Sequence, residues 1–248
     1  MLEHTFIHIQ GIGPNTERMF WDRGIRTWDS FLSEKRTVLS PGRDQFIKEE
    51  LEASVRHLDD IRFFSKRLSC GEIWRIYDAF KEKTVFLDIE TSGGGQGYDE
   101  ITLIGMYDAH KVQTFINGKN LEEFETAIAD YDLMITFNGS IFDIPYIRRF
   151  FPCISLPPAH IDLRFLLKKL GYSGGLKKIE EDFGLERAPE IKGLNGYAAV
   201  MMWNSYQSGD QNALKRLIEY NTADIVNLEP LMEKAYREMK AKLLSPAC

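Results

Sequence analysis

The sequence is poor in the features that mark several classes of protein. Its three cysteines, Cys70, Cys153 and Cys248, are odd in number and far apart, and without a CxxC spacing they indicate neither a disulfide framework nor a zinc site. No uninterrupted apolar segment approaches the roughly 20 residues of a membrane-spanning helix, and the first residues lack the basic-then-apolar order of a signal peptide. We therefore expect a cytoplasmic protein with free thiols and no membrane partner.

An excess of positive charge is also missing. Lys and Arg number 31 against 37 Asp and Glu, which gives a formal net charge of -6. This balance argues against a protein that wraps nucleic acid by bulk electrostatics, because that energy scales with the number of phosphates neutralised. An enzyme that binds only a chain end stays open, since two divalent cations would add about four positive charges within a pocket.

The chain is long enough for a substantial core. Its 248 residues are 44% hydrophobic and 12% aromatic, which allows one large domain or two smaller ones. The pattern changes after about residue 71. We therefore expect a small helical region over residues 1–71 and the main domain over residues 72–248.

Residues 1–71 contain a glycine-punctuated turn, Gln10 to Thr16, which predicts the start of a helix with Asn15 or Thr16 as its cap. The turn resembles half of a helix-hairpin-helix module, whose backbone amides hold a phosphate, although simple chain reversal is the more common meaning of such a turn. The apolar spacing over 43–68 predicts one amphipathic helix, and a last short helix is predicted over 72–80.

The main domain begins with strands and ends with helices. Apolar runs predict strands over 84–90, 101–107, 112–116 and 133–137 and a helix over 121–131. A short strand is expected before His160 and Asp162, and later helices are expected to begin near Asp162, Leu176, Leu194 and Gln211. The glycine-rich loop 93–97 follows the first strand, so it either shapes the mouth of a pocket or is a tolerated insertion.

Two acids lie in the first strand, Asp88 and Glu90. Because strand side chains alternate between faces, both carboxylates point the same way. Charges are costly to bury unless they are paired or bind a metal. A hydrophobic strand that carries both acids is therefore a candidate set of metal ligands.

Two further stretches supply the other candidates. Asp143 follows the strand at 133–137 and enters a short helix, where a single acid is more often a cap than a ligand. Tyr220 and Asp224 are four residues apart on a long helix and share one face, which taken singly is usually a surface pair. Together with Asp88 and Glu90, these residues suggest a site for two divalent cations.

Three motifs in this order carry a resemblance to a known family: Asp88-Ile89-Glu90-Thr91, Asn138 to Tyr146 with Phe142-Asp143, and Tyr220-x-x-x-Asp224. They resemble the three exonuclease motifs of the DnaQ-like ribonuclease-H-fold superfamily, and the tyrosine is typical of its DEDDy branch. The second motif is similar to that of the proofreading domain of family B DNA polymerases. The nearest group is the YprB-type predicted exonucleases, whose pattern is echoed in 74–75, 160–164 and 174–180. The likeness covers residues 72–231.

The resemblance implies an α/β ribonuclease-H-like fold with a mixed five-stranded sheet flanked by helices. It implies a metal-dependent 3′–5′ exonuclease that acts on the end of single-stranded DNA or RNA. Two Mg²⁺ or Mn²⁺ ions would be held by Asp88, Glu90, Asp143 and Asp224. Tyr220 would orient the attacking water, because a phenol with an ordinary pKa of about 10 is a poor base at neutral pH.

Other residues carry weaker predictions. We expect Thr91, Asn138 and Lys177 to contact the substrate, although the lysine doublet at 177–178 also fits a solvated helix face. Asp162 fits a helix N-cap better than a site residue.

Two other functions stay open on the sequence. One is a catalytically inactive relative that binds nucleic acid or a partner protein. The other is an unrelated metal-dependent phosphoesterase that acts on a small molecule.

Overall fold

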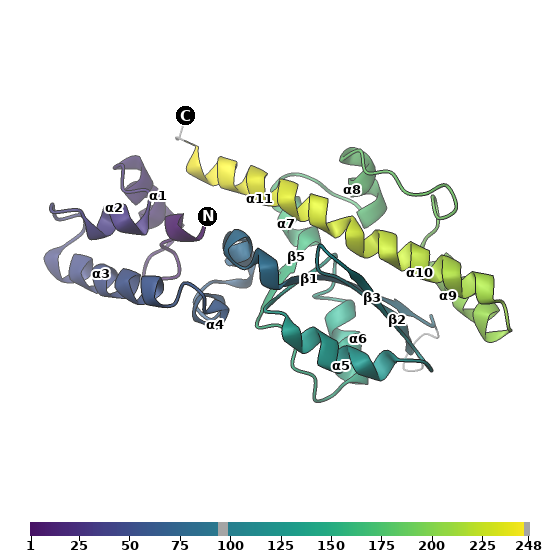
Figure 1. Ribbon diagram of the computed structural model, residues 1–248. Helices are drawn as coiled ribbons and strands as arrows, with labels where there is room; N and C mark the ends of the chain where they lie inside the picture. Colours follow the sequence, from purple (N-terminus) through teal and green to yellow (C-terminus); the bar gives the residue numbers. More distant parts are fainter. Residues whose placement is uncertain (94–98, 246–248) are drawn as a thin grey trace. The chain divides into compact units, whose positions relative to one another are not determined.

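The computed structural model describes residues 1–93 and 99–245, and this part of the chain forms two compact units (Figure 1). Among the described residues, the first unit consists of 1–81 and 236–245, and the second lies within Glu82–Ala235. These are units of packing, and the division into domains at 1–71 and 72–248 stays a prediction. No helix among the described residues is long and apolar enough to cross a membrane.

The first unit is helical. Its elements are η1 (Leu2–His4), α1 (Pro14–Asp22), α2 (Trp28–Leu32), α3 (Pro41–Arg56), α4 (Ile61–Ser65), η2 (Cys70–Ala79) and the end of α11 (Leu228–Leu244). Fully buried aromatic rings form its core, with the Phe6 and Phe20 centroids 5.3 Å apart and those of Phe20 and Phe31 5.2 Å apart. Burial of these rings stabilises a unit that has no sheet in its described residues.

Two helix predictions in this unit were wrong in detail. Helix α1 begins at Pro14, with Gly13 as its N-cap and no side-chain cap, because proline is favoured at the first helical position. The single helix expected over 43–68 is two helices, α3 and α4. Asp60 accepts a hydrogen bond from the backbone N–H of Arg62 at 2.9 Å and so starts α4 anew. The segment at 72–80 is a 3₁₀ helix.

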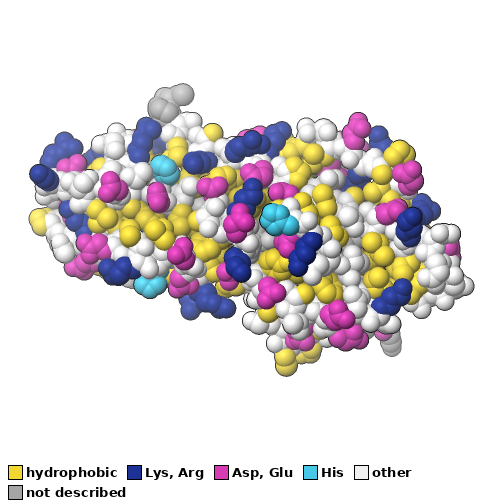
Figure 2. Space-filling view, viewed as in Figure 1, with side chains coloured by type: hydrophobic (Ala, Val, Ile, Leu, Met, Phe, Trp, Pro, Cys, Tyr) yellow, Lys and Arg dark blue, Asp and Glu magenta, His cyan; other side chains and the backbone are white. Residues whose placement is uncertain are grey.

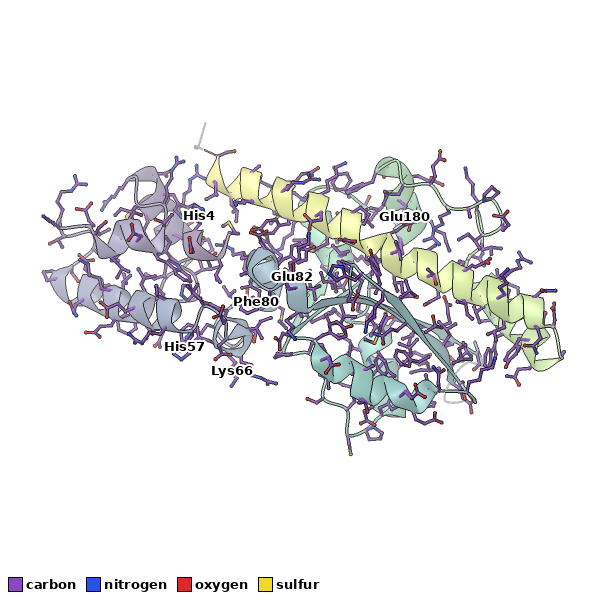
Figure 3. The ribbon with its side chains drawn as sticks, viewed as in Figure 1. His4, His57, Lys66, Phe80, Glu82 and Glu180 are labelled. Atoms are coloured by element: carbon purple, nitrogen blue, oxygen red, sulfur yellow. The ribbon has the colours of Figure 1, made fainter. Side chains whose placement is uncertain are left out.

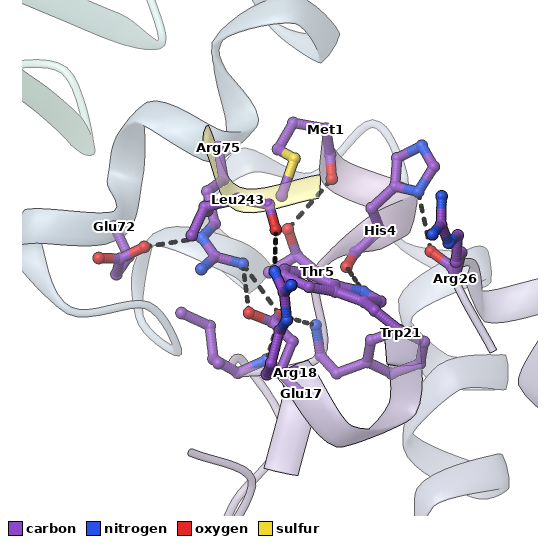
Figure 4. Close-up of polar contacts among 12 residues, drawn as sticks. Met1, His4, Thr5, Glu17, Arg18, Trp21, Arg26, Glu72, Arg75 and Leu243 are labelled. Carbon is purple, nitrogen blue, oxygen red and sulfur yellow. Dashed lines mark hydrogen bonds and ion pairs between the residues drawn. The ribbon is translucent and has the colours of Figure 1, made fainter. Parts of the chain in front are cut away.

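A buried ion-pair network ties η2 to α1 (Figure 4). Arg75 donates from Nη1 to both carboxylate oxygens of Glu17 at 2.9 Å and from Nε to Glu72 at 2.7 Å. The side chains of Arg75 and Glu17 are 3% and 2% exposed. Removal of either partner would leave an uncompensated buried charge, so the pair fixes how η2 packs against α1.

The second unit is built on a five-stranded mixed sheet, as predicted. Its strands are β1 (Thr84–Thr91), β2 (Ile101–Tyr107), β3 (Val112–Ile116), β4 (Leu133–Thr136) and β5 (Ala159–Asp162), in the order β3-β2-β1-β4-β5. The pairings β1 with β2 and β2 with β3 are antiparallel, whereas β1 with β4 and β4 with β5 are parallel. The central strand is therefore β1, which carries Asp88 and Glu90.

Helices cover both faces of this sheet (Figure 1). The described helical elements of the unit are η3 (Lys81–Lys83), η4 (Leu121–Glu123), α5 (Phe124–Ala127), η5 (Ile128–Asp130), α6 (Asp143–Phe150), α7 (Leu163–Lys169), α8 (Leu176–Asp182), α9 (Gly196–Gln207), α10 (Gln211–Val226) and the start of α11. Leu87 and Ile89 of β1 belong to the core cluster that contains Phe124 and Ile147 of α5 and α6. Because strand side chains alternate, Asp88 and Glu90 face the layer of α9 and α10.

The glycine-rich loop predicted at 93–97 falls almost wholly outside the described residues. Only Gly93 is described, and its φ of +67° is accessible mainly to glycine. A Cβ at this position would lie 2.7 Å from Val200 on α9. The start of the loop is therefore in close contact with α9.

Asp162 organises the turn between β4 and α6. Its Oδ1 accepts hydrogen bonds from the backbone N–H groups of Asn138 at 2.8 Å and Arg164 at 3.1 Å, and its Oδ2 accepts one from Ser140 at 3.1 Å. The predicted N-cap of α7 is thus confirmed, and the same carboxylate holds Asn138, whose φ is +69°. The turn leads directly to Asp143.

We expect Asp162→Ala to lower the free energy of unfolding by about 2–3 kcal/mol, since a cap and two turn hydrogen bonds are lost together. Asp210 provides the control, because it caps α10 alone, and Asp210→Ala should cost only about 1 kcal/mol. Urea unfolding followed by circular dichroism measures both. Equal losses in the two variants would show that Asp162 is no more than a cap.

Candidate functional site

Three of the four predicted acids converge from two elements, β1 and α10. Carboxylate oxygens of Asp88 and Glu90 on β1 and of Asp224 on α10 lie within 4.8 Å of one another. The first residue of α6, Asp143, lies outside this set. Its Oδ1 instead accepts a hydrogen bond from the backbone N–H of Ile89 at 3.1 Å, which places the fourth carboxylate beside β1.

Burial and mutual repulsion make these acids weak. Glu90 and Asp224 are each 7% exposed and Asp143 is 2% exposed. Burial, followed by the charge of Asp224, raises the pKa of Glu90 to about 8. Burial also raises the pKa of Asp143 to about 7, with the charges of Asp162 and Asp224 adding to it. The pKa of Asp88 is raised by burial and then by Asp143, Asp224 and Glu90.

The donor set fits hard divalent cations. All the ligand atoms are carboxylate oxygens, and Glu90 Oε1 is buried without a hydrogen-bond partner among the described residues. Mg²⁺ binds oxygens at about 2.1 Å, so two ligands on opposite sides of one ion are about 4.2 Å apart. The three oxygens, all within 4.8 Å of one another, are therefore close enough for their side chains to converge on a shared cation.

Asn221 holds Asp88 in place. Its Nδ2 donates to Asp88 Oδ2 at 2.9 Å, and its side chain is buried against Gly105, which lies opposite Asp88 in the antiparallel register of β1 and β2. A Cβ on Gly105 would lie 1.9 Å from Asn221 Oδ1. The missing side chain at this position makes room for the amide that orients Asp88.

Tyr220 lies one turn before Asp224 and is bound by Lys177. The Lys177 Nζ donates to the Tyr220 hydroxyl at 2.5 Å. Burial, together with the charge of Asp224, raises the pKa of Tyr220 above its ordinary value, so the phenol stays protonated at neutral pH. Burial lowers the pKa of Lys177.

A buried arginine contacts Asp224, the third acid of the cluster. Arg187 follows α8 and donates from Nε and Nη2 to the two oxygens of Glu180 at 2.7 Å each, and its Nη2 also bonds Asp224 Oδ1. Glu180, labelled in Figure 3, projects from α8 and is 2% exposed. Asn227 donates to the same carboxylate at 3.0 Å.

The acids open into a pocket of about 440 Å³, which Thr91 lines together with Tyr146, Tyr197 and Tyr220. Asn138 lines a separate pocket of about 760 Å³ with Arg164 and Phe165. Gly196 borders both pockets. Of the three residues predicted to contact substrate, Thr91 lies with the acids, Lys177 lies on Tyr220, and Asn138 lies in the neighbouring pocket.

The family model described as RNase_H superfamily matches residues 85–236, which include every acid of the site. The chain belongs to the RNase_H superfamily. The predicted superfamily and its ribonuclease-H-like α/β fold are thus confirmed, and the DEDDy branch stays a prediction.

The chain is similar to solved structures at low sequence identity. A family B DNA polymerase from Pyrobaculum calidifontis is 18% identical, with a TM-score of 0.49, over 61% of this chain and 24% of the polymerase. The Nibbler EXO domain of Aedes aegypti is 14% identical, with a TM-score of 0.39, over 70% of this chain and 92% of that domain. The chain thus spans about a quarter of the polymerase that it matches. No curated protein matches.

Four residues of this RNase_H superfamily site are absent from the sequence predictions: Asn221, Gly105, Glu180 and Arg187. Asn221 lies three residues before Asp224 on α10, so its place beside the site could have been inferred from helix geometry. Glu180 ends the echoed stretch at 174–180. No local pattern marks Gly105 or Arg187, because their contacts with Asn221 and Asp224 span more than 35 residues of sequence.

We expect Gly105→Ala to displace Asn221 and release Asp88. The variant should lose about 1–3 kcal/mol of stability, as overpacked cores do, and its affinity for Mn²⁺ should fall. Gly118→Ala is the control, since Gly118 has open space around it. Its φ is +74°, however, so it should show a stability loss without a change in Mn²⁺ affinity. Isothermal titration calorimetry and urea unfolding separate the two effects, and unchanged Mn²⁺ affinity in Gly105→Ala would contradict the assigned role.

Stability without metal should fall as pH rises. The folded pKa of Glu90, about 8, lies above its ordinary 4.5, and that of Asp143, about 7, lies above 3.8. Between about pH 4 and 8 the native state therefore binds more protons than the unfolded state, and the free energy of unfolding decreases with pH.

Thermal unfolding in EDTA at pH 5.5 and 8 tests this pH dependence. Glu90→Gln should flatten the decline, because the amide does not titrate. Mg²⁺ should raise the melting temperature more at pH 8 than at pH 5.5, since the ligands must first lose their protons. An identical pH dependence in the wild type and Glu90→Gln would refute the assignment of the shift to this carboxyl group.

Proposed function

We propose that this chain is a metal-dependent exonuclease of the DEDDy type, which hydrolyses phosphodiester bonds at the 3′ end of single-stranded DNA or RNA. The observation that carries the proposal is the cluster of carboxylate oxygens from Asp88, Glu90 and Asp224 within 4.8 Å, on a chain of the RNase_H superfamily. The 3′–5′ polarity rests on the resemblance of the three motifs.

Asp88, Glu90 and Asp224, with Asp143 beside them, would hold two Mg²⁺ or Mn²⁺ ions. Oxygen ligands are those that hard cations prefer, and Glu90 Oε1, which has no hydrogen-bond partner among the described residues, is available to serve as one. When bound, such a pair of cations activates a water and neutralises charge on the attacking and leaving oxygens.

Tyr220 orients the attacking water in this proposal. Its hydroxyl accepts a hydrogen bond from Lys177, so its own hydrogen is available to donate. Because its pKa is raised, the phenol does not act as a base. Lys177 fixes the phenol from the side of α8. A phosphate contact of Lys177 with substrate stays a prediction.

The residues around the acids suit a single-stranded nucleic acid as substrate. Phe142 and Tyr197 line the acid pocket, and they are 38% and 72% exposed. Exposed rings stack on unpaired bases without sequence preference. On the face shown in Figure 2, basic side chains are interspersed with acidic ones. This face therefore gives no reason to expect electrostatic attraction to a long duplex.

Labelled single- and double-stranded DNA and RNA, incubated with Mg²⁺, Mn²⁺ or EDTA, test the proposal. We expect stepwise shortening of 5′-labelled single strands, with loss of activity in EDTA. Asp88→Ala and Asp224→Ala should reduce the rate at least 10³-fold, an order-of-magnitude expectation for loss of an essential metal ligand. Tyr220→Phe should lower the rate about 10²-fold while Mn²⁺ affinity stays unchanged, because the phenol orients water.

Matched controls exclude general damage to the fold. Asp182→Ala alters an exposed acid of α8 that pairs with Lys178, and it should leave the rate unchanged. Binding of nucleic acid without shortening would contradict the proposal in favour of an inactive relative. Turnover of small phosphodiesters alone would contradict it in favour of a small-molecule phosphoesterase, and shortening of 3′-blocked strands from the 5′ end would overturn the polarity.

A further inference from the structure

Each of three site acids has one oxygen held by a donor from another part of the fold. Asp88 is held by the amide of Asn221, and Asp143 by the backbone N–H of Ile89. Asp224 is held by the Arg187 guanidinium, which carries a full positive charge. The third ligand is therefore restrained by an ion pair rather than by a neutral hydrogen bond.

A second carboxylate, that of Glu180, fixes the orientation of the Arg187 guanidinium. Its side chain is 5% exposed, and Glu180 accepts two parallel hydrogen bonds from it, each at 2.7 Å. Glu180 is fixed in turn by Asn227 at the C-cap of α10. A bidentate pair of this kind determines both the position and the plane of a guanidinium.

A purely structural ion pair does not account for the whole arrangement. Glu180 already accepts two hydrogen bonds from the Arg187 guanidinium, from Nε and Nη2. Nη2 also bonds Asp224, and Nη1 is buried without a partner among the described residues. The guanidinium thus leaves one buried donor unmatched while it contacts a carboxylate of the cluster. An unpartnered buried donor is costly, so the position of Arg187 has a reason other than packing.

We propose that Arg187 is a positioning residue of the metal centre, which holds one oxygen of Asp224 and presents the other to a divalent cation. The inference rests on the proposed function, because it takes Asp224 as a metal ligand. Before a cation binds, the guanidinium also offsets part of the repulsion between Asp224 and the acids of β1. Groups that orient metal ligands in this way typically contribute 10–100-fold to affinity.

The experiment measures Mn²⁺ affinity of the full chain by isothermal titration calorimetry without nucleic acid. Arg187→Met alone would leave Glu180 buried and unpaired, so the double variant E180M/R187M is the main one; apolar replacement of a buried pair is often neutral for stability. We expect it to keep the wild-type melting temperature in EDTA and to bind Mn²⁺ about 10-fold more weakly or worse. Arg187→Lys keeps the positive charge but not the bidentate geometry, so its Mn²⁺ affinity should lie between those of the wild type and E180M/R187M.

Arg216→Met is the control, because Arg216 lies exposed on α10 and, among the described residues, bonds the backbone oxygen of Glu190 alone, at 3.4 Å. Its Mn²⁺ affinity should match that of the wild type. Wild-type affinity in a folded E180M/R187M chain would overturn the inference and leave Arg187 as a structural residue. If the double variant does not fold, wild-type affinity in Arg187→Lys would overturn it equally. Failure of the wild type to bind Mn²⁺ would instead remove the metal centre of the proposed function.

Discussion

Repulsion among buried carboxylates is the constraint on which the second unit depends. Asp88, Glu90 and Asp224 cluster with Asp143 beside them, and burial raises the pKa of all four. The charges of neighbouring acids raise the pKa values of Asp88, Glu90 and Asp143 further. Such a cluster opposes folding unless protons, cations or donors compensate it. The fold supplies the donors at fixed points, and the remaining unmatched oxygens define what the site can bind.

The donors that hold the acids are of two kinds, neutral and charged. Asn221 and the backbone of β1 hold Asp88 and Asp143 without adding charge. Arg187 adds a charge, but Glu180 balances it within the same network. The net negative charge of the acid cluster is therefore preserved for a ligand, while the orientation of each acid is already set in the folded chain.

Much of the fold followed from the sequence because its signals are local. The alternation in 84–90 placed Asp88 and Glu90 on one face, and the strands β1 to β3 lie where the apolar runs indicated. Helix boundaries were less predictable in the first unit. Pro14 moved the start of α1 before Asn15, and Asp60 divided the long helix, since a single cap or turn outweighs apolar spacing.

The positions of the clustered acids could be predicted from the sequence, but the residues that hold them could not. The three motifs are each contiguous along the chain, so they marked the acids and Tyr220 as candidates, and the metal-binding and catalytic roles of these residues stay predictions. Gly105 and Arg187 act through contacts distant in sequence, and a glycine in a strand or an arginine in a loop has no distinctive local pattern. Asp143 also shows the limit of motif spacing, since it lies beside the cluster of three rather than within it.

The lengths of neighbouring strands explain why the cluster is open at all. Parallel pairing of β1 with β4 ends at Phe86 and Ile135, so β1 continues beyond its neighbour by the residues that carry the acids. The N–H of Ile89, left without a strand partner on that side, is the group that Asp143 binds. A longer β4 would pair with this amide and close the opening beside β1. The early end of β4 is therefore the architectural origin of the pocket.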